Sequence, residues 1–470
     1  MDRLDRFFEI SERRSTVGAE LRGGLVTFIA MAYIIVLNPI ILSSAPDVDG
    51  HKLDFAQVSA TTSLAAGVMT ILFGVIARLP FAFAAGLGIN SFLATTVVGS
   101  LTWPEAMGLV VINGLIIVLL AVTGLRRLVF DAVPMQLKLA ITAGIGLFIL
   151  FIGLVDAGFI SSTGLPSPPV GLGTGGVGTI STVPTLVFVF TLLVTGILVV
   201  RKIRGGILIG LVSGTVVAVV IEAIWHLGAA ADRPGGWSLS VPALSGSPFA
   251  WPDLSLVGEF SLSSFSRIGV LAAVMLVFTL VFANFFDAMG TLTGLSREAG
   301  LSDEQGNIPR LRAALIVEGA GAAVGGATSA SSNTVFIESG AGIEEGARTG
   351  LANLVTGGLF LAAMFISPLA SIVPTEVAAA ALVIVGALMV SQVRHIDIAE
   401  FSVALPVVLT IAVMPFSYSI ANGIGVGFIA WVVMRTAAAK WRDISPLLWI
   451  VALGFVVYFA RGGIESIIGM

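Results

Sequence analysis

Two carboxylates stand inside segments that are otherwise apolar or small. Asp287 lies in Val281–Leu295, VFANFFDAMGTLTGL, and Glu338 lies in Ser329–Gly342, SASSNTVFIESGAG. Removing an ionised carboxylate from water costs several kcal/mol even after the protein relaxes. An acid within a membrane span is therefore a candidate functional residue, able to accept hydrogen bonds from a ligand or to carry a proton. The alternative is that each acid is buried against a neighbouring helix and has no role in function.

The elements that position these acids are predicted to be membrane spans. Of the 470 residues, 56% are hydrophobic and 11% are charged, and the mean hydropathy is +1.03. Soluble domains contain about 25% charged residues. Long apolar runs follow one another with short links, which predicts a helical membrane protein with many spans and the lipid bilayer as its partner.

Several other classes of protein do not fit the composition. The 24 basic and 28 acidic residues give a formal charge of −4, without the basic patch that nucleic-acid binding requires. The absence of cysteine excludes disulfides, thiolate metal sites and cysteine nucleophiles. His51, His226 and His395 are far apart in the sequence, so no metal site is expected. Because no nucleotide loop or nucleophile–base pair is visible either, we expect neither an enzyme nor a cofactor.

Apolar periodicity and helix breakers divide the chain into two sets of seven spans. Basic residues, among them Arg126, Arg127 and Arg201, follow even-numbered spans, which predicts a cytoplasmic N-terminus. Seven spans in each half would make the halves inverted. Phe7, Phe8 and Ile10 indicate either a short surface helix or a solvated tail. The predicted parts are an N-terminal segment at 1–22, seven spans at 23–226, a connecting loop at 227–267, seven spans at 268–436 and a C-terminal segment at 437–470. The C-terminal segment contains an apolar stretch, Pro446–Ala460, which could cross the membrane, re-enter it or lie on its surface. A further exposed loop is expected at 161–179, which is rich in Pro and Gly.

Two segments are short and interrupted by glycine. Leu79–Phe92 in the first half and Ser329–Gly342 in the second each join a β-favouring stub, Phe81–Phe83 or Thr334–Ile337, to a Gly-rich start of a half-helix. Interrupted segments at matching positions in two halves predict a transporter's site at the middle of the membrane, because a broken helix exposes backbone groups that need partners. The alternative is close helix packing through small residues.

Five motifs resemble the AzgA-like purine permeases, a branch of the nucleobase–cation symporter 2 family. They follow one another from about residue 5 to 460, and the combination is specific. The motifs are FFEISERRSTVGAELRGGLVTFIAMAYIIVLNP near the N-terminus, AAGLGIN (Ala84–Asn90), FFDAMGTLTG (Phe285–Gly294), SSNTVFIESGAGIEEGARTG (Ser331–Gly350) and MPFSYSIANGIGVGF (Met414–Phe428).

The resemblance implies an all-α polytopic fold of fourteen spans in two inverted seven-span repeats, divided into a core and a gate domain. Spans 3 and 10 would carry short antiparallel strands that meet at mid-membrane. Asp287 takes the place of an acid from span 8, and Glu338 that of an acid from span 10. Further substrate-binding positions are Phe336, Phe81 or Phe83, and the strand and half-helix positions Ala84, Ile337 and Ser339. Asn284 departs from the family pattern, which often has an acid there. Asn90 and Thr291 either line the cavity or bond neighbouring spans.

These residue types suit a purine base. A carboxylate accepts strong, charge-assisted bonds from neighbouring N–H donors, and a phenyl face offers about 1–3 kcal/mol of stacking. Two carboxylates in a low dielectric repel, which favours a proton on one of them. We expect Glu338 to hold the base and Asp287 to carry the coupled proton, with the reverse assignment open.

The resulting hypothesis is a symporter in the cell membrane that takes up hypoxanthine, guanine or adenine with a proton rather than sodium. The family likeness also suggests a homodimer. The alternatives are a transporter of small anions, or of uracil- and xanthine-type substrates, on the same fold. Anion sites favour a basic residue or half-helix N-termini without opposing acids, so two acids at mid-membrane argue against the first alternative.

Overall fold

The structure is a computed structural model that describes residues 2–125, 132–165, 167–176, 178–238, 240–243, 247, 249–302 and 308–468. Arg126 and Arg127, used above to predict the orientation, lie outside these residues. Ten helices in the described part are long and apolar enough to cross a membrane. The chain is therefore a multi-pass helical membrane protein, as its composition predicts.

Helices occupy the predicted spans in both halves. In the first half they are α2 (Val17–Met31), α3 (Ile34–Ser44), α4 (Phe55–Ile76), α5 (Leu87–Phe92) with a π-helical turn at Leu93–Val97, α6 (Trp103–Thr123), α8 (Met135–Asp156), α9 (Val183–Val200) and α10 (Gly206–Trp225). In the second half they are α11 (Ser264–Ile268), α12 (Val270–Glu298), α13 (Leu311–Ala327), α14 (Ser339–Glu344), α15 (Leu351–Ala363), α16 (Ser367–Ala370), α17 (Thr375–Val390), α18 (Phe401–Phe416) and α19 (Ile420–Ala437). The undecided C-terminal stretch is part of one helix, α20 (Pro446–Ile468), which packs on α19 and α12.

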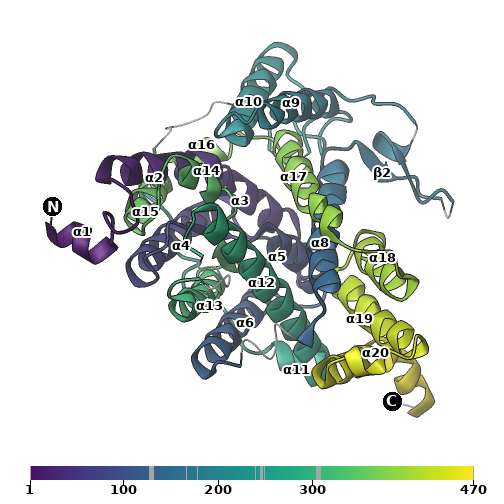
Figure 1. Cartoon of the computed structure of the whole chain (residues 1–470). Coiled ribbons are helices and arrows are strands. Elements are labelled where there is room, and N and C mark those ends of the chain that lie inside the picture. Colours follow the sequence, from purple (N-terminus) through teal and green to yellow (C-terminus); the bar gives the residue numbers. More distant parts are fainter. Residues whose placement is uncertain are drawn as a thin grey trace.

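The helices pack in two groups, and each group draws on both halves of the chain. In the first group α4 lies against α15 and α6 against α13, with α2 covering α14 and α15. In the second group α8 and α9 lie against α17, and α18 packs on α8 and α19 (Figure 1). The long helix α12 contacts both groups, through α6 and α14 on one side and α8 and α20 on the other.

Small residues set the close approach of several helix pairs. A side chain at Gly114 of α6 would overlap the backbone of Gly319 and Ala323 on α13, and one at Gly319 would overlap Val118. Close backbone approach through glycine is typical of helices that pack within membranes. Glycine therefore allows α6 and α13 to pack closely.

The N-terminal segment is helical at α1 (Asp2–Phe8) and docks on the protein. Phe8 and Ile10 are buried against Leu351. Glu9 pairs with Arg13 at 2.7 Å, Arg78 at 3.0 Å and Arg310 at 2.7 Å. Burial acts to raise the pKa of Glu9, but hydrogen bonds and charges from these arginines lower it overall. This charged cluster ties α1 to the ends of α4 and α13.

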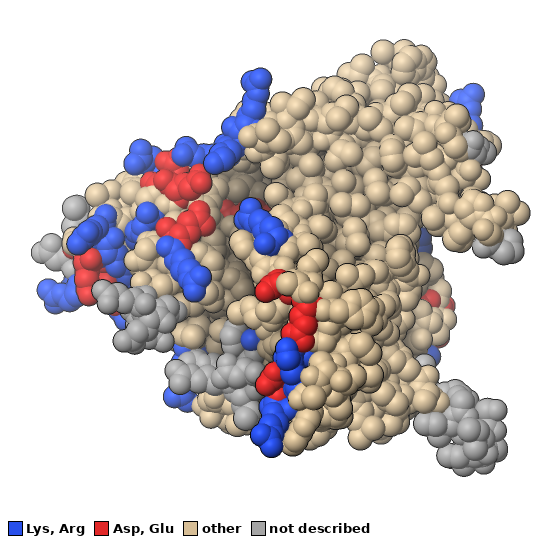
Figure 2. Space-filling view, turned by 45° about the vertical axis from the view of Figure 1, so that its right-hand side comes forward, with Lys and Arg blue, Asp and Glu red and all other residues tan. Residues whose placement is uncertain are grey.

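Outside the spans, the Pro/Gly-rich stretch near 161–179 contains a short hairpin that the sequence analysis missed. Strands β2 (Ile160–Ser162) and β3 (Val170–Leu172) pair antiparallel there. Figure 2 shows a broad area without acidic or basic side chains beside a charged one, and α9 and α10 expose large apolar residues such as Leu193, Ile197 and Val216. Such faces suit contact with lipid.

Candidate substrate site

The two interrupted segments meet through paired strands. Strands β1 (Phe83–Ala85) and β4 (Asn333–Val335) are antiparallel, with Phe83 opposite Val335, Ala84 opposite Thr334, and Ala85 opposite Asn333. The strands expected in spans 3 and 10 are therefore present, within two residues of the predicted stubs. Each strand leads into a short helix, α5 after β1 and α14 after β4.

Side chains from neighbouring helices satisfy the backbone of these strands. The hydroxyl of Thr70 accepts from the Phe83 amide at 2.9 Å and donates to its carbonyl at 3.2 Å. The Asn353 amide donates to the Phe81 carbonyl at 2.7 Å, and Ser339 Oγ accepts from the Ala82 amide at 2.9 Å. Strands inside a membrane need such partners because neither water nor a wider sheet is available to them.

The aromatic candidates separate onto two sides of the strand pair. Phe81 and Phe83 are fully buried and pack against Phe73 of α4, with ring centroids 6.3 and 4.8 Å away. Phe336 belongs instead to the apolar cluster that includes Ala84. In strands, alternate side chains face opposite sides. Phe336 and Ala84 therefore share the side away from the two packed rings.

Glu338 lies at the junction of β4 and α14 and is half-buried. The hydroxyl of Tyr33 donates a 2.5 Å hydrogen bond to its Oε1. Tyr33 is fully buried at the break between α2 and α3. From this position its hydroxyl reaches Glu338 at the start of α14. Next to Glu338, Ile337 is 64% exposed, whereas Ser339 is buried.

Asp287 lies in the middle of α12, a helix that contacts both β4 and α14, and is half-buried. Thr291 follows one helical turn later on the same side of α12 and is also half-buried. The two acids, Thr291 and the strand pair thus form one polar neighbourhood.

Asn90 does not reach these acids through any hydrogen bond within the described residues. Its amide donates to Asn38 Oδ1 at 2.5 Å, and the Asn38 amide donates to Thr62 at 2.7 Å and to the Ala330 carbonyl at 3.0 Å. These bonds connect α5, α3, α4 and the start of the second interrupted segment. Asn90 therefore bonds a neighbouring span through its amide, and its role in lining the cavity stays a prediction.

Glu318 of α13 is a third acid near the strands. It is fully buried on a helix that contacts β4. The part of the chain that the structure describes contains no cluster of three or more metal-ligating side chains.

Sequence reasoning missed Tyr33. The signal was available, because only three tyrosines occur in the chain and this one interrupts the apolar run AMAYIIVLNP. A hydroxyl in the middle of a span needs a partner. The identity of that partner, some 300 residues away, depends on the fold.

Two broken spans meet through a strand pair in this membrane protein, and carboxylates lie beside the strands. This is the architecture of a transporter. The transmembrane domain of a cyanobacterium bicarbonate transporter, BicA, is similar in structure, with a TM-score of 0.58 over 90% of this chain and 97% of that one. The sequences are 17% identical, so this likeness shows the fold alone.

The family follows from the sequence. A model described as Permease family matches residues 18–426. The chain is 37% identical to the guanine/hypoxanthine permease PbuG of Bacillus subtilis, over 97% of this chain and 99% of that protein. It is 35% identical to the adenine permease AdeP of Escherichia coli, over 97% and 95%. The chain belongs to this Permease family, which confirms the resemblance, and it is a transporter rather than an enzyme.

Proposed function

We propose that this protein takes up purine nucleobases, with hypoxanthine, guanine and adenine as the candidate set, across the cell membrane by proton-coupled alternating access. The observation that carries the proposal is the carboxylate of Glu338, held by Tyr33 at 2.5 Å beside the strand pair, where α12, the helix of Asp287, contacts β4 and α14. The names of the relatives, guanine/hypoxanthine and adenine permeases, support the same substrate class.

In this proposal Glu338 accepts the N–H donors of the base and Phe336 stacks on its face. The Ala84 and Ile337 backbone and Thr291 complete the pocket, and Asp287 carries the coupled proton. A charge-assisted hydrogen bond is about twice as strong as a neutral one. Phe81 and Phe83 contribute by fixing the strand that carries Ala84, because both rings pack against Phe73.

We also propose that the fourteen predicted spans form two inverted repeats, with a cytoplasmic N-terminus. The helix contacts support this arrangement. If the first seven spans correspond to the last seven, exchanging the halves converts the pair α4–α15 into the pair α13–α6, and both pairs are observed. The same exchange maps β1–β4 and α8–α17 onto themselves, and these contacts are observed as well.

The test is uptake into proteoliposomes with labelled hypoxanthine, guanine, adenine, uracil, sulfate and bicarbonate, each with and without an inward proton gradient or a sodium gradient. We expect the three purines to accumulate when the proton gradient is present. Accumulation of sulfate or bicarbonate without purine transport would refute the proposal, and a sodium requirement would refute its coupling.

Asp287→Asn tests the division of roles between the two acids. The amide cannot carry a proton, so the variant should lose pH-driven accumulation while Glu338→Gln loses binding itself. Asp232→Asn, an exposed acid in the connecting loop, serves as the control. Full pH-dependent accumulation by Asp287→Asn would remove this residue from the coupling step.

A further inference from the structure

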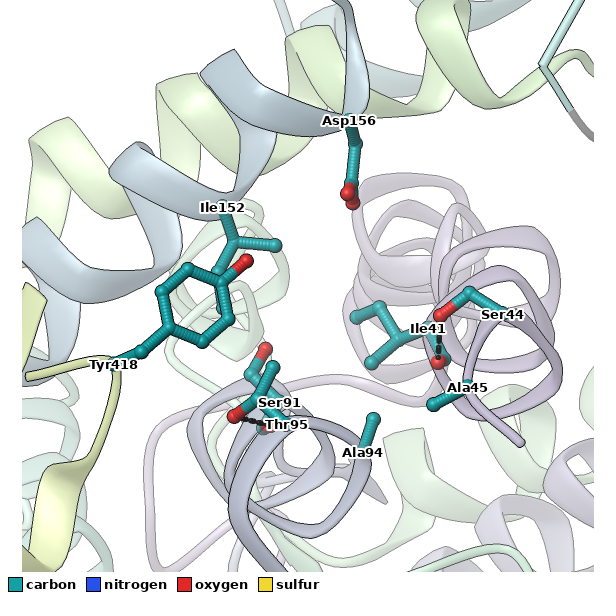
Figure 3. Close-up of a pocket in the computed structure, with 9 residues that line it drawn as sticks. All are labelled: Ile41, Ser44, Ala45, Ser91, Ala94, Thr95, Ile152, Asp156 and Tyr418. Carbon is teal, nitrogen blue, oxygen red and sulfur yellow. Dashed lines mark hydrogen bonds between the residues drawn. The ribbon is translucent and has the colours of Figure 1, made fainter. Parts of the chain in front are cut away.

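A second polar cavity lies between the two helix groups, apart from the strand pair. Its volume is about 280 Å³, near the lower end of small-molecule pockets. Ser44 at the end of α3 and Ser91 and Thr95 of α5 and its π-helical turn line one side, and Asp156 at the end of α8 and Tyr418 between α18 and α19 line the other (Figure 3). None of its lining residues belongs to the site around Glu338 and Asp287.

The cavity offers hydrogen-bond acceptors above all. Figure 3 shows the Asp156 carboxylate pointing into it. The hydroxyls of Ser44 and Thr95 donate to the carbonyls of Ile41 at 2.8 Å and Ser91 at 2.7 Å. Their protons are used, so both oxygens remain as acceptors. The hydroxyl of Ser91 is fully buried and lacks a partner in the described part of the chain.

Tyr418 adds an aromatic surface that is held in place. Its ring meets Phe148 and Phe151 of α8 edge-on, with centroids 5.6 and 6.0 Å away. Its backbone has a φ of 54°, a conformation that is unfavourable for a bulky residue. The hydroxyl of Thr96 donates to the Tyr418 carbonyl at 3.3 Å, across the boundary between the two helix groups.

We propose that this cavity is a second nucleobase site, in which the N–H edge of the base meets Asp156 and its face lies on Tyr418. The proposal rests on the proposed function, since it takes the same substrate class. With the N-terminus cytoplasmic, both α3 and α8 end on the external side, so the cavity lies on the entry route. An acceptor-rich pocket fits a ligand that brings several N–H donors in one plane.

The competing occupant is a sodium ion. A hard cation of this kind is held by several convergent oxygens, whereas the remaining walls of the cavity are apolar and formed by Ile41, Ala45, Ala94 and Ile152. The ring of Tyr418, the apolar walls and the single carboxylate of Asp156 together favour a flat organic ligand that carries N–H groups.

The absence of native cysteine gives a direct test. Ser44→Cys and, separately, Thr95→Cys place one thiol in the cavity, and Ser371→Cys places one at an exposed position outside it. The purified full-length variants in nanodiscs are treated with a charged methanethiosulfonate reagent, with and without hypoxanthine. A ligand at about ten times its Kd leaves about a tenth of the sites free, so modification should slow about tenfold.

Protection should persist when Glu338→Gln removes the central site, disappear with Asp156→Asn, and leave Ser371→Cys unaffected. Protection that vanishes with Glu338→Gln would trace the effect to the central site and overturn the proposal. So would protection by sodium alone, or normal hypoxanthine uptake without any protection of either cavity thiol. If the wild-type protein takes up no hypoxanthine, the proposed function is overturned, and the second site with it.

Discussion

Tyr33→Phe removes one hydroxyl and leaves the ring in place. In the structure that hydroxyl donates a 2.5 Å bond to Glu338 Oε1 from a fully buried position. Hydrogen bonds to charged groups contribute about 1.5–3 kcal/mol. If the bond orients the carboxylate for the substrate, its loss should weaken hypoxanthine binding about 10- to 150-fold, at about 1.4 kcal/mol for each factor of ten.

The assay is equilibrium binding of labelled hypoxanthine to the purified protein, together with the KM of uptake into proteoliposomes. Thr279→Val is the matched control. It deletes a buried hydroxyl on α12 that donates only to the carbonyl of Met275 in its own helix. Both variants should remain folded at the assay temperature, whereas only Tyr33→Phe should lose affinity. An unchanged Kd and KM in folded Tyr33→Phe would refute the idea that Tyr33 positions Glu338.

Three further perturbations test the support around the site. Thr70→Val should weaken hypoxanthine binding, because the Phe83 amide loses its partner, and an unsatisfied buried donor costs about 1–3 kcal/mol. Gly114→Ala should lower the Tm in detergent, because a Cβ there overlaps α13, whereas Gly358→Ala meets open space and should not. Glu9→Gln should destabilise the protein by roughly 0.5–1 kcal/mol at neutral pH. Because the pKa of Glu9 is lowered in the folded protein, its contribution is present above the ordinary value of 4.5 and is lost as the pH falls further. The Tm difference from wild type should therefore shrink in acid.

Much of the fold could be predicted because membrane spans are recognisable from the local sequence alone. Apolar runs of helix length, broken by glycine and proline, locate helices without reference to distant contacts. The strand stubs were also visible, since Phe81–Phe83 and Thr334–Ile337 are β-favouring residues next to glycine-rich sequence. The hairpin of β2 and β3 was not predicted, because its Ser, Pro and Gly residues are equally typical of an irregular loop.

The contacts that complete the site could not be predicted in the same way. Tyr33 and Glu338 are 305 positions apart in the chain, and no local pattern connects them. Phe81, Phe83 and Phe336 are all phenylalanines beside strands, and their sequence positions do not show which rings pack against Phe73. That assignment depends on the register of β1 and β4 and on the helices that cover each side.

The placement of the two polar sites bears on how such a transporter could move. β1 and β4 are bonded to each other and held by Thr70 and Asn353, so the strand pair behaves as one unit with the first helix group. Movement that opens a route for substrate is then expected at the boundary with the second group. The hydroxyl of Thr96 donates to the Tyr418 carbonyl across this boundary at 3.3 Å, and Arg204 pairs with Glu345 across it as well. A cavity at that boundary would change shape whenever the groups shift, so a base bound at Asp156 and Tyr418 would favour one arrangement of the groups.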